Sequence, residues 1–170
     1  MASQQQLDRL KAVVPAAQLC ATLYGVPASV TLAQWILESS WGASGLTLKA
    51  NNCFGVKYSQ KAGDEAYVEI PTAEYESGKR VMIEAQFVKY ASCADSFKGH
   101  ALLLSKLLRY RPAMKDAHIP RAFAVDLQKC GYSTNPHYGD ELLGLMHEYD
   151  LAQYDVPQPT EPAAQMKEAA

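Results

Sequence analysis

Two kinds of periodicity divide the chain into helical and extended segments. Apolar residues recur at helical spacing before residue 50 and again after residue 92, whereas an alternating pattern stands only between Tyr67 and Phe87. We expect this alternating segment to form a β-hairpin with its turn near Ser77 and Gly78, because glycine suits a tight turn. The pattern predicts an α+β protein that is mainly helical.

Proline and glycine set the expected ends of the first helices. Pro15 interrupts the first apolar pattern, so we expect a short N-terminal helix and a second helix that begins near Pro15 and ends at Gly25. Further helices are expected over residues 43–50, 93–108, 120–129 and 138–149, with a turn at residues 51–52.

A third helix is expected between these segments. It should open near Ser29 or Thr31, because Thr31 and Gln34 have the spacing of a capping box, and it should stop before Gly42. Val30, Ala33, Leu37 and Trp41 form one apolar stripe, and Leu32, Trp35 and Ile36 form another. A helix that is apolar on most faces is buried, and we expect both tryptophans in the core.

Glu38 occupies the narrow gap between these two stripes. Apolar surroundings and the negative end of a helix dipole both disfavour a carboxylate, so we predict a raised pKa for Glu38. A carboxylic acid that stays protonated near neutral pH can protonate a glycosidic oxygen. The alternative is a partly exposed glutamate near a helix end, with no chemical role.

Glycoside cleavage usually needs a second carboxylate. The candidates in this chain are Asp64, Glu65, Glu69, Glu74, Glu76, Asp95, Asp140 and Glu141. Glu74 precedes the expected hairpin turn, a position from which it can reach over a cleft. A solvated acid at a hairpin is the alternative interpretation.

Length and composition indicate one soluble globular domain. The chain has 170 residues, of which 48% are hydrophobic and 20% charged, enough for a single core. We expect the domain to cover residues 1–154 and a disordered, proline-rich tail to cover residues 155–170. The net charge of −2 gives no case for nucleic acid, and the apolar runs are too short for membrane insertion.

The N-terminus lacks a basic segment followed by an apolar one, so we expect no Sec signal peptide. The protein then acts in the cytoplasm or leaves by a route that the sequence does not encode, such as holin-type release or delivery by a secretion system. A monomer is expected.

Cysteine, histidine and basic residues add no further site. The cysteines, which lack a close pair of the kind that zinc sites use, are expected to be buried free thiols: Cys20, Cys53, Cys93 and Cys130. The histidines show no ligand spacing and are expected at the surface or in satisfied core positions: His100, His118, His137 and His147. Lys106, Arg109, Arg111 and Lys115 are interpreted as a solvated face. No metal or cofactor is predicted.

Three motifs in order resemble glycoside hydrolase family 73, the N-acetylglucosaminidases of bacterial autolysins, phage lysins and the flagellar peptidoglycan hydrolase. The first is AQWILESSWG with ANNCFGVK, over residues 33–57. The second is TAEY at residues 72–75 with FVKYAS at 87–92, and the third is GYSTNPHY at 131–138. The resemblance covers about residues 10–152. The chain departs from the family pattern at Ser40, where glycine is usual, and at Cys53, where leucine is usual.

The resemblance implies a lysozyme-like fold, with a helical core and a small β-hairpin lobe over the substrate groove. It also implies roles for matched residues: Glu38 as general acid, Glu74 as general base or charge stabiliser, and Tyr132 as an aromatic residue near the cleavage point. We group these three as catalytic. The expected substrate-binding residues are Phe54 and Gly55, in the cleft wall, together with Asn51, Asn52 and Tyr138. Asp95, which also falls in a matched motif, is expected in a helix N-cap.

The function that the resemblance implies is an endo-β-N-acetylglucosaminidase acting on peptidoglycan glycan strands. It would cut the β-1,4 bond between N-acetylglucosamine and N-acetylmuramic acid. Two alternatives stay open at this point. One is a lytic transglycosylase or muramidase on the same fold, and the other is a non-catalytic wall-binding module.

Overall fold

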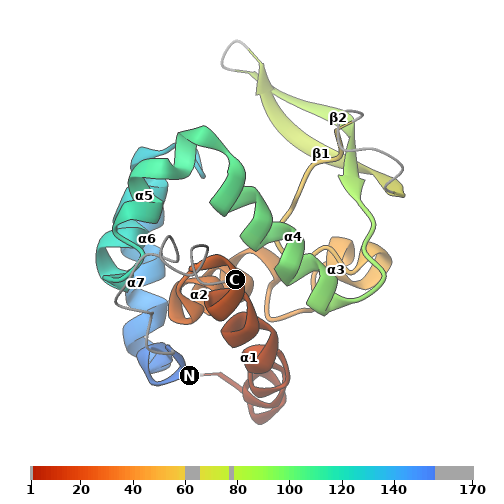
Figure 1. Cartoon of the computed structure of the whole chain (residues 1–170). Coiled ribbons are helices and arrows are strands. Elements are labelled where there is room, and N and C mark those ends of the chain that lie inside the picture. The colour runs from red at the N-terminus through yellow and green to blue at the C-terminus, as the bar shows by residue number, and fades with distance from the viewer. Residues whose placement is uncertain (1, 60–65, 77–78, 156–170) are drawn as a thin grey trace, which may run out of the picture.

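The computed structural model describes residues 2–59, 66–76 and 79–155, and it gives the backbone alone for the described part of residues 73–81. A helical body carries a hairpin that projects from one side (Figure 1). The α-helices are α1 (Gln4–Tyr24), α2 (Ala28–Ser39), α3 (Gly45–Ala50), α4 (Cys93–Lys106), α5 (Arg111–Lys115), α6 (Pro120–Lys129) and α7 (Tyr138–Glu148). Two 3-10 helices, η2 (Leu108–Tyr110) and η3 (Leu151–Tyr154), complete the body. The expected hairpin turn and all but the first residue of the expected tail lie outside the described residues.

Helix α2 forms the centre of the helical body. Ten of its 12 residues are buried, and α1, α6, α7 and η3 pack around it. Only Leu37 and Glu38 are exposed. The predicted burial of the helix is confirmed and Glu38 lies on its exposed part, but Leu37, which was placed in an apolar stripe, is exposed as well. Trp35 is buried and Trp41 packs against the core, as expected.

Helix α1 runs through Pro15 without a break, so the prediction of two helices is wrong. Pro15 has no N–H to donate to the Lys11 carbonyl, a loss that usually ends a helix. Both residues are exposed, so water can reach that carbonyl. The opposite face of α1, on both sides of Pro15, is buried against α2 and α4, and this tertiary packing outweighs the local loss.

Helix α2 begins earlier than predicted, because its N-terminal cap comes from the other end of the chain. The backbone N–H of Ser29 donates to Asp155 Oδ1 at 2.8 Å. Thr31 lies inside the helix, and its hydroxyl donates to the Pro27 carbonyl. The expected capping box of Thr31 and Gln34 is therefore wrong.

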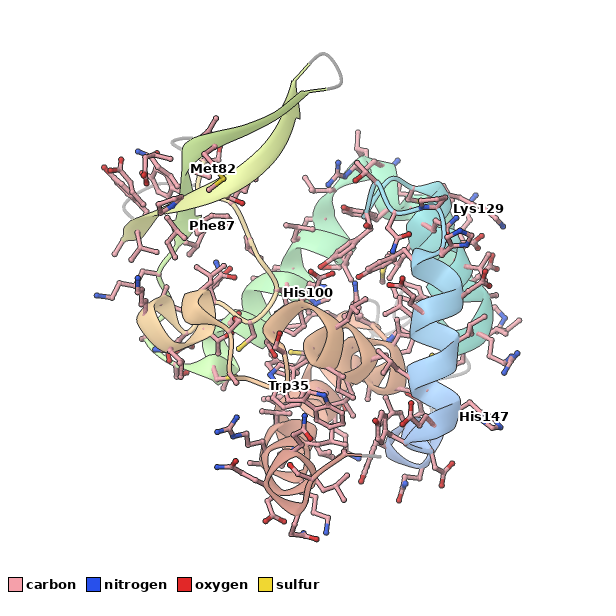
Figure 2. All side chains as sticks on the ribbon, turned by 180° about the vertical axis from the view of Figure 1, so that it is seen from behind. Trp35, Met82, Phe87, His100, Lys129 and His147 are labelled. Atoms are coloured by element: carbon pink, nitrogen blue, oxygen red, sulfur yellow. The ribbon has the colours of Figure 1, made fainter. Side chains whose placement is uncertain are left out.

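Strands β1 (Tyr67–Glu76) and β2 (Lys79–Val88) form the predicted hairpin, which we call the hairpin lobe. They pair antiparallel, with Tyr67 opposite Val88 and Glu76 opposite Lys79. Two backbone hydrogen bonds, from the Tyr58 N–H to the Gln86 carbonyl and from the Val88 N–H to the Val56 carbonyl, attach the lobe to the segment after α3. Figure 2 shows Met82 and Phe87 on the hairpin lobe and Trp35 and His100 inside the helical body.

The later helices follow the predicted ranges, with three additions, one of which is η3. Ser92 is the N-cap of α4 and accepts from the Asp95 N–H, and the Asp95 carboxylate accepts from the Ser92 hydroxyl. Asp95 therefore supports the cap from the first turn of the helix and is not the N-cap residue that was expected. The short elements η2 and α5 were not predicted. All four cysteines are free thiols, two of them buried and two partly buried. No helix in the described part of the chain is long and apolar enough to cross a membrane.

Candidate active site

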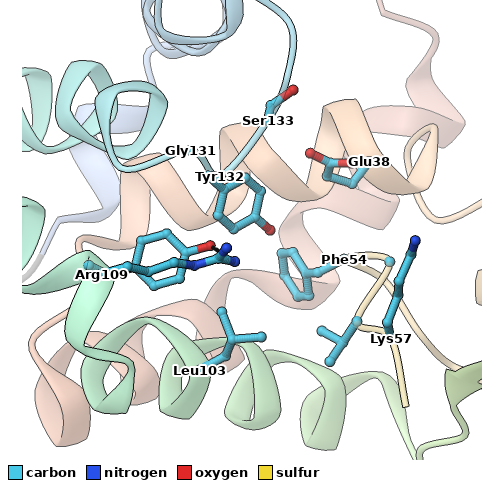
Figure 3. Close-up of a pocket in the computed structure, with 11 residues that line it drawn as sticks. Glu38, Phe54, Lys57, Leu103, Arg109, Gly131, Tyr132 and Ser133 are labelled. Atoms are coloured by element: carbon cyan, nitrogen blue, oxygen red, sulfur yellow. Dashed lines mark hydrogen bonds between the residues drawn. The ribbon is translucent and has the colours of Figure 1, made fainter. Parts of the chain in front are cut away.

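A cavity of about 480 Å³ lies beside the C-terminal end of α2. Its walls come from four parts of the chain: α2, the segment after α3, the region from α4 to η2, and the connection between α6 and α7 (Figure 3). The lining residues are Glu38, Phe54, Gly55, Val56, Lys57, Leu103, Arg109, Tyr110, Gly131, Tyr132 and Ser133. Four of the predicted site residues, Glu38, Phe54, Gly55 and Tyr132, thus meet at one cavity.

Glu38 reaches the cavity from the last turn of α2. Its side chain is accessible to solvent, yet the surrounding protein removes enough water from the carboxyl group to raise its pKa above the ordinary value. The charge of Glu141 acts in the same direction, and a hydrogen bond from Tyr138 opposes it. The predicted direction of the pKa shift is confirmed, with burial as the main cause.

Tyr138 connects Glu38 to the core. Its hydroxyl donates to Glu38 Oε1 at 3.0 Å and accepts from Gln34 Nε2, also at 3.0 Å. The side chain is only 2% exposed and does not line the cavity. This hydrogen bond restricts the orientation of the Glu38 carboxyl group, and substrate binding by Tyr138 stays a prediction.

Tyr132 lies in an aromatic cluster at the cavity wall. Its ring stacks on Tyr138, with centroids 5.4 Å apart, and contacts Tyr110 and His100. Figure 3 shows its hydroxyl directed toward the space between Glu38 and Phe54. Burial, with the nearby Glu38 charge, raises the pKa of Tyr132 well above its ordinary value. The phenol therefore stays neutral and can donate a hydrogen bond into the cavity.

Phe54 and His100 support the floor of the cavity. The Phe54 ring stacks on His100 with centroids 4.1 Å apart and meets Phe97 edge-on. His100 is fully buried, and neither ring nitrogen has a hydrogen-bond partner among the described residues. Burial lowers the pKa of His100 to about 3, so the ring is neutral. The expectation of a surface or satisfied core position is wrong for His100.

Asn51 and Asn52 do not line the cavity. They support its wall through hydrogen bonds to backbone groups. Asn51 Nδ2 donates to the carbonyls of residues 90 and 91. Asn52 Nδ2 donates to the carbonyls of Val56 and Val88, and its Oδ1 accepts from the Val56 N–H. Both amides are thus engaged with backbone groups, and substrate binding by either residue stays a prediction.

Glu74, the predicted second acid, lies in β1 opposite Val81. Its side chain is outside what the structure describes, so its role stays a prediction. The acid whose charge acts on Glu38 is Glu141, in the first turn of α7. Asn135 Nδ2 donates to Glu141 Oε1 at 2.9 Å.

Sequence reasoning missed several residues of the cavity wall, and Arg109 is the most informative of them. Arg109 is exposed, in keeping with its interpretation as part of a solvated face, and it also lies over the Tyr110 ring, 4.6 Å from the centroid, and donates to the Tyr110 hydroxyl. The unpredicted element η2 places it there. Lys57 adds a second cationic residue to the same cavity. The adjacent arginine and tyrosine in the sequence were the available signal.

No group of three or more potential ligand residues (His, Cys, Asp or Glu) is arranged to hold a metal ion in the described part of the chain.

Known proteins share both the sequence and the fold. A family model described as mannosyl-glycoprotein endo-beta-N-acetylglucosaminidase matches residues 14–151. The exo-glucosaminidase LytG of Bacillus subtilis (strain 168) is 40% identical over 149 residues, which cover 85% of this chain and 51% of LytG. The peptidoglycan hydrolase FlgJ of Pseudomonas aeruginosa is 33% identical over 145 residues, which cover 83% of this chain and 36% of FlgJ.

Solved structures agree with these matches. The catalytic domain of the autolysin Auto from Listeria monocytogenes superposes with a TM-score of 0.79 at 29% identity, covering 91% of this chain and 90% of that domain. The chain belongs to this glucosaminidase family, glycoside hydrolase family 73, and the predicted fold is confirmed. It spans about half the length of LytG and about a third of FlgJ.

Proposed function

We propose that this chain is a peptidoglycan hydrolase that cleaves the β-1,4 bond between N-acetylglucosamine and N-acetylmuramic acid. The observation that carries this proposal is Glu38, a carboxyl group with a raised pKa that lines a cavity of about 480 Å³. The relatives support it, because they are named exo-glucosaminidase, peptidoglycan hydrolase and autolysin.

In the proposed reaction, protonated Glu38 donates its proton to the glycosidic oxygen as the bond breaks. The Tyr138 hydroxyl bonds Oε1 and thereby limits the orientations of the carboxyl group. The neutral Tyr132 hydroxyl offers a further hydrogen bond to the sugar. Burial of the acid supplies the protonated form at a higher pH than a solvated glutamate would allow.

Glu74 is the proposed second acid, with two possible roles. It acts as general base on a water molecule, which inverts the configuration at the anomeric carbon, or it stabilises charge while the substrate's own acetamido group attacks, which retains it. Glu74→Gln should lower kcat in either case. The anomeric configuration of the first product, measured by NMR, distinguishes the two roles.

The rival functions are a lytic transglycosylase or muramidase and a non-catalytic wall-binding module. The names of the relatives favour neither of them. The released ends separate the three: a glucosaminidase leaves reducing N-acetylglucosamine, a muramidase leaves reducing muramic acid, and a transglycosylase leaves anhydro-muramic acid. The family model is described as an endo-acting enzyme, whereas LytG is named an exo-acting one. The length of the released fragments should therefore be measured as well, because an endo-acting enzyme cuts within the strand and an exo-acting one cuts at its end.

The deciding experiment compares the parent protein with Glu38→Gln on purified cell walls, with fragments identified by mass spectrometry. We expect reducing N-acetylglucosamine ends from the parent and none from the variant, which should keep the parent's circular dichroism spectrum. Glu148→Gln, the same change at an exposed position of α7, is the matched control and should remain active. Normal turnover by Glu38→Gln would rule out its role as the acid.

The place where the domain acts follows from the proposed substrate. We infer that the domain acts as a monomer on glycan strands in the cell wall, outside the cytoplasm. Holin-type release and delivery by a secretion system are both compatible with this site of action.

A further inference from the structure

Cys53 and Cys93 bring two thiols together at the base of the hairpin lobe. Their Sγ atoms lie 3.0 Å apart. The S–S bond of a disulfide is about 2.05 Å long, so the two sulfurs need to approach by only about 1 Å. Neither cysteine lines the cavity that holds Glu38, and the proposed hydrolysis does not use them.

The pair lies where the two ends of the hairpin lobe meet the helical body. Cys53 follows α3, Cys93 is the first residue of α4, and the whole lobe lies between them in the chain. Three consecutive residues, 51–53, form hydrogen bonds with the segment that leads from the end of β2 into α4. The side chains of Asn51 and Asn52 donate to carbonyls within residues 88–91, and the Cys53 N–H donates to the Ser96 hydroxyl at 2.9 Å. A disulfide between Cys53 and Cys93 would add a covalent bond to the hydrogen bonds that already join these two segments.

The two thiols differ in accessibility. Cys53 is fully buried. Cys93 is partly exposed and lines a second cavity of about 310 Å³, together with Val13, Trp41 and Leu48 among others. An external reagent can therefore reach Cys93 first. The hydrogen bond with Cys53 lowers the pKa of the Cys93 thiol, which favours the nucleophilic thiolate.

We propose that Cys53 and Cys93 are a disulfide site, closed by thiol–disulfide exchange with an external disulfide, and that closing it locks the base of the hairpin lobe. The Cys93 thiolate attacks one sulfur of the external disulfide, forms a mixed disulfide and releases one thiolate. Cys53 then loses its proton, attacks Cys93 Sγ and displaces the second thiolate. The two cysteines give up two electrons, and the external disulfide leaves as two thiols that carry the two cysteine protons.

The bond would cross-link residues 40 apart in the chain and so constrain the unfolded state. From loop-closure entropy for a loop of this length, we expect oxidation to raise the Tm by about 10 °C. The next four residues, 54–57, all line the Glu38 cavity, so the bond also ties one of its walls to α4.

The experiment treats the fully reduced protein with oxidised glutathione, counts thiols in denaturant, maps disulfides by peptide mass spectrometry and measures Tm. None of these readouts depends on the proposed hydrolysis. We expect two of the four thiols to disappear, a single Cys53–Cys93 linkage, a higher Tm, and reversal by dithiothreitol. The double variant Cys20→Ala/Cys130→Ala keeps only the proposed pair and should lose both remaining thiols.

Two further variants test the order of attack. Cys53→Ala should stop at the mixed disulfide, with one glutathione on Cys93, and Cys93→Ser should show no rise in Tm. Four free thiols after oxidation of the parent, a linkage that involves Cys20 or Cys130, or an unchanged Tm in the linked protein would overturn the proposal. The comparison of oxidised with reduced parent protein needs no variant, so a folding defect in a variant cannot obscure the result.

Discussion

The Tyr138 hydroxyl donates a 3.0 Å hydrogen bond to Glu38 Oε1, although 100 residues separate the two in the chain. Gln34, on the same helix as Glu38, donates to the Tyr138 hydroxyl in turn. The proposed acid is therefore held by a short chain of hydrogen bonds that begins and ends on α2. This arrangement explains why the third motif contains a tyrosine that does not line the cavity.

Replacing Tyr138 with phenylalanine should shift the pH dependence of hydrolysis. The hydroxyl stabilises the carboxylate, so its removal raises the pKa of Glu38 further. A general acid works in its protonated form, and the alkaline limb of kcat/KM should therefore move to higher pH. The buried Gln34 amide also loses its acceptor, which should cost about 1–3 kcal/mol of unfolding free energy.

The matched control for this change is Tyr149→Phe, because the Tyr149 hydroxyl bonds the exposed Glu148 carboxylate instead. Its pH profile should coincide with that of the parent. An unshifted alkaline limb in Tyr138→Phe would show that the hydrogen bond does not tune Glu38.

Arg109→Gln should weaken substrate binding more than catalysis. Arg109 lines the cavity, and the proposed substrate carries carboxylates on its peptide stems. Removing a charge-assisted hydrogen bond at a partly exposed site should raise KM about 10-fold with little change in kcat. Kinetics on soluble glycan fragments at two salt concentrations would test this, because the KM of the parent should also rise with salt. Arg111→Gln, outside the cavity, should behave as the parent, and a fall confined to kcat would contradict a binding role.

His100 should make the fold sensitive to acid. Burial holds its pKa at about 3, whereas the unfolded chain binds the proton near pH 6.5. Between these values the unfolded state carries more protons, so this contribution to stability is complete above about pH 6.5 and falls by up to about 1.4 kcal/mol for each unit below it. Urea unfolding at a series of pH values from 7.5 to 4.5 would measure the slope.

His100→Leu should remove this part of the acid dependence, whatever its effect on stability at pH 7.5. The exposed His118→Leu, which loses a histidine at the surface, should keep the slope of the parent. Equal slopes in the parent and His100→Leu would show that His100 is not the source.

Asn52→Ala should damage both stability and binding. Its amide bonds four backbone groups of the segments that form the cavity wall and the base of the hairpin lobe. Leaving these buried groups without partners should lower the unfolding free energy by about 2–3 kcal/mol. The wall at residues 54–57 would lose its support, so KM should rise as well. Asn52→Asp keeps the acceptor and loses the donor; stability between those of the parent and Asn52→Ala would confirm that both halves of the amide contribute.

Local patterns predicted much of this fold. Alternation predicted the hairpin, the nearly all-round apolar pattern of residues 28–39 predicted a buried helix, and residues 92–96 predicted the start of a helix. These features depend on neighbours within a few positions, so the residues themselves contain the information. The same holds for the motif order that indicated the family.

Contacts between distant segments decided the rest. Packing of one face of α1 keeps the helix intact through Pro15, and Asp155 caps α2 across 126 residues. Tyr138 reaches Glu38 only because α7 packs against α2, and Arg109 reaches the cavity only because η2 turns it there. The sequence alone thus identified Glu38 as the candidate acid. Which residues tune its pKa and which residues line its cavity depend on how distant segments pack together. No local pattern encodes that packing.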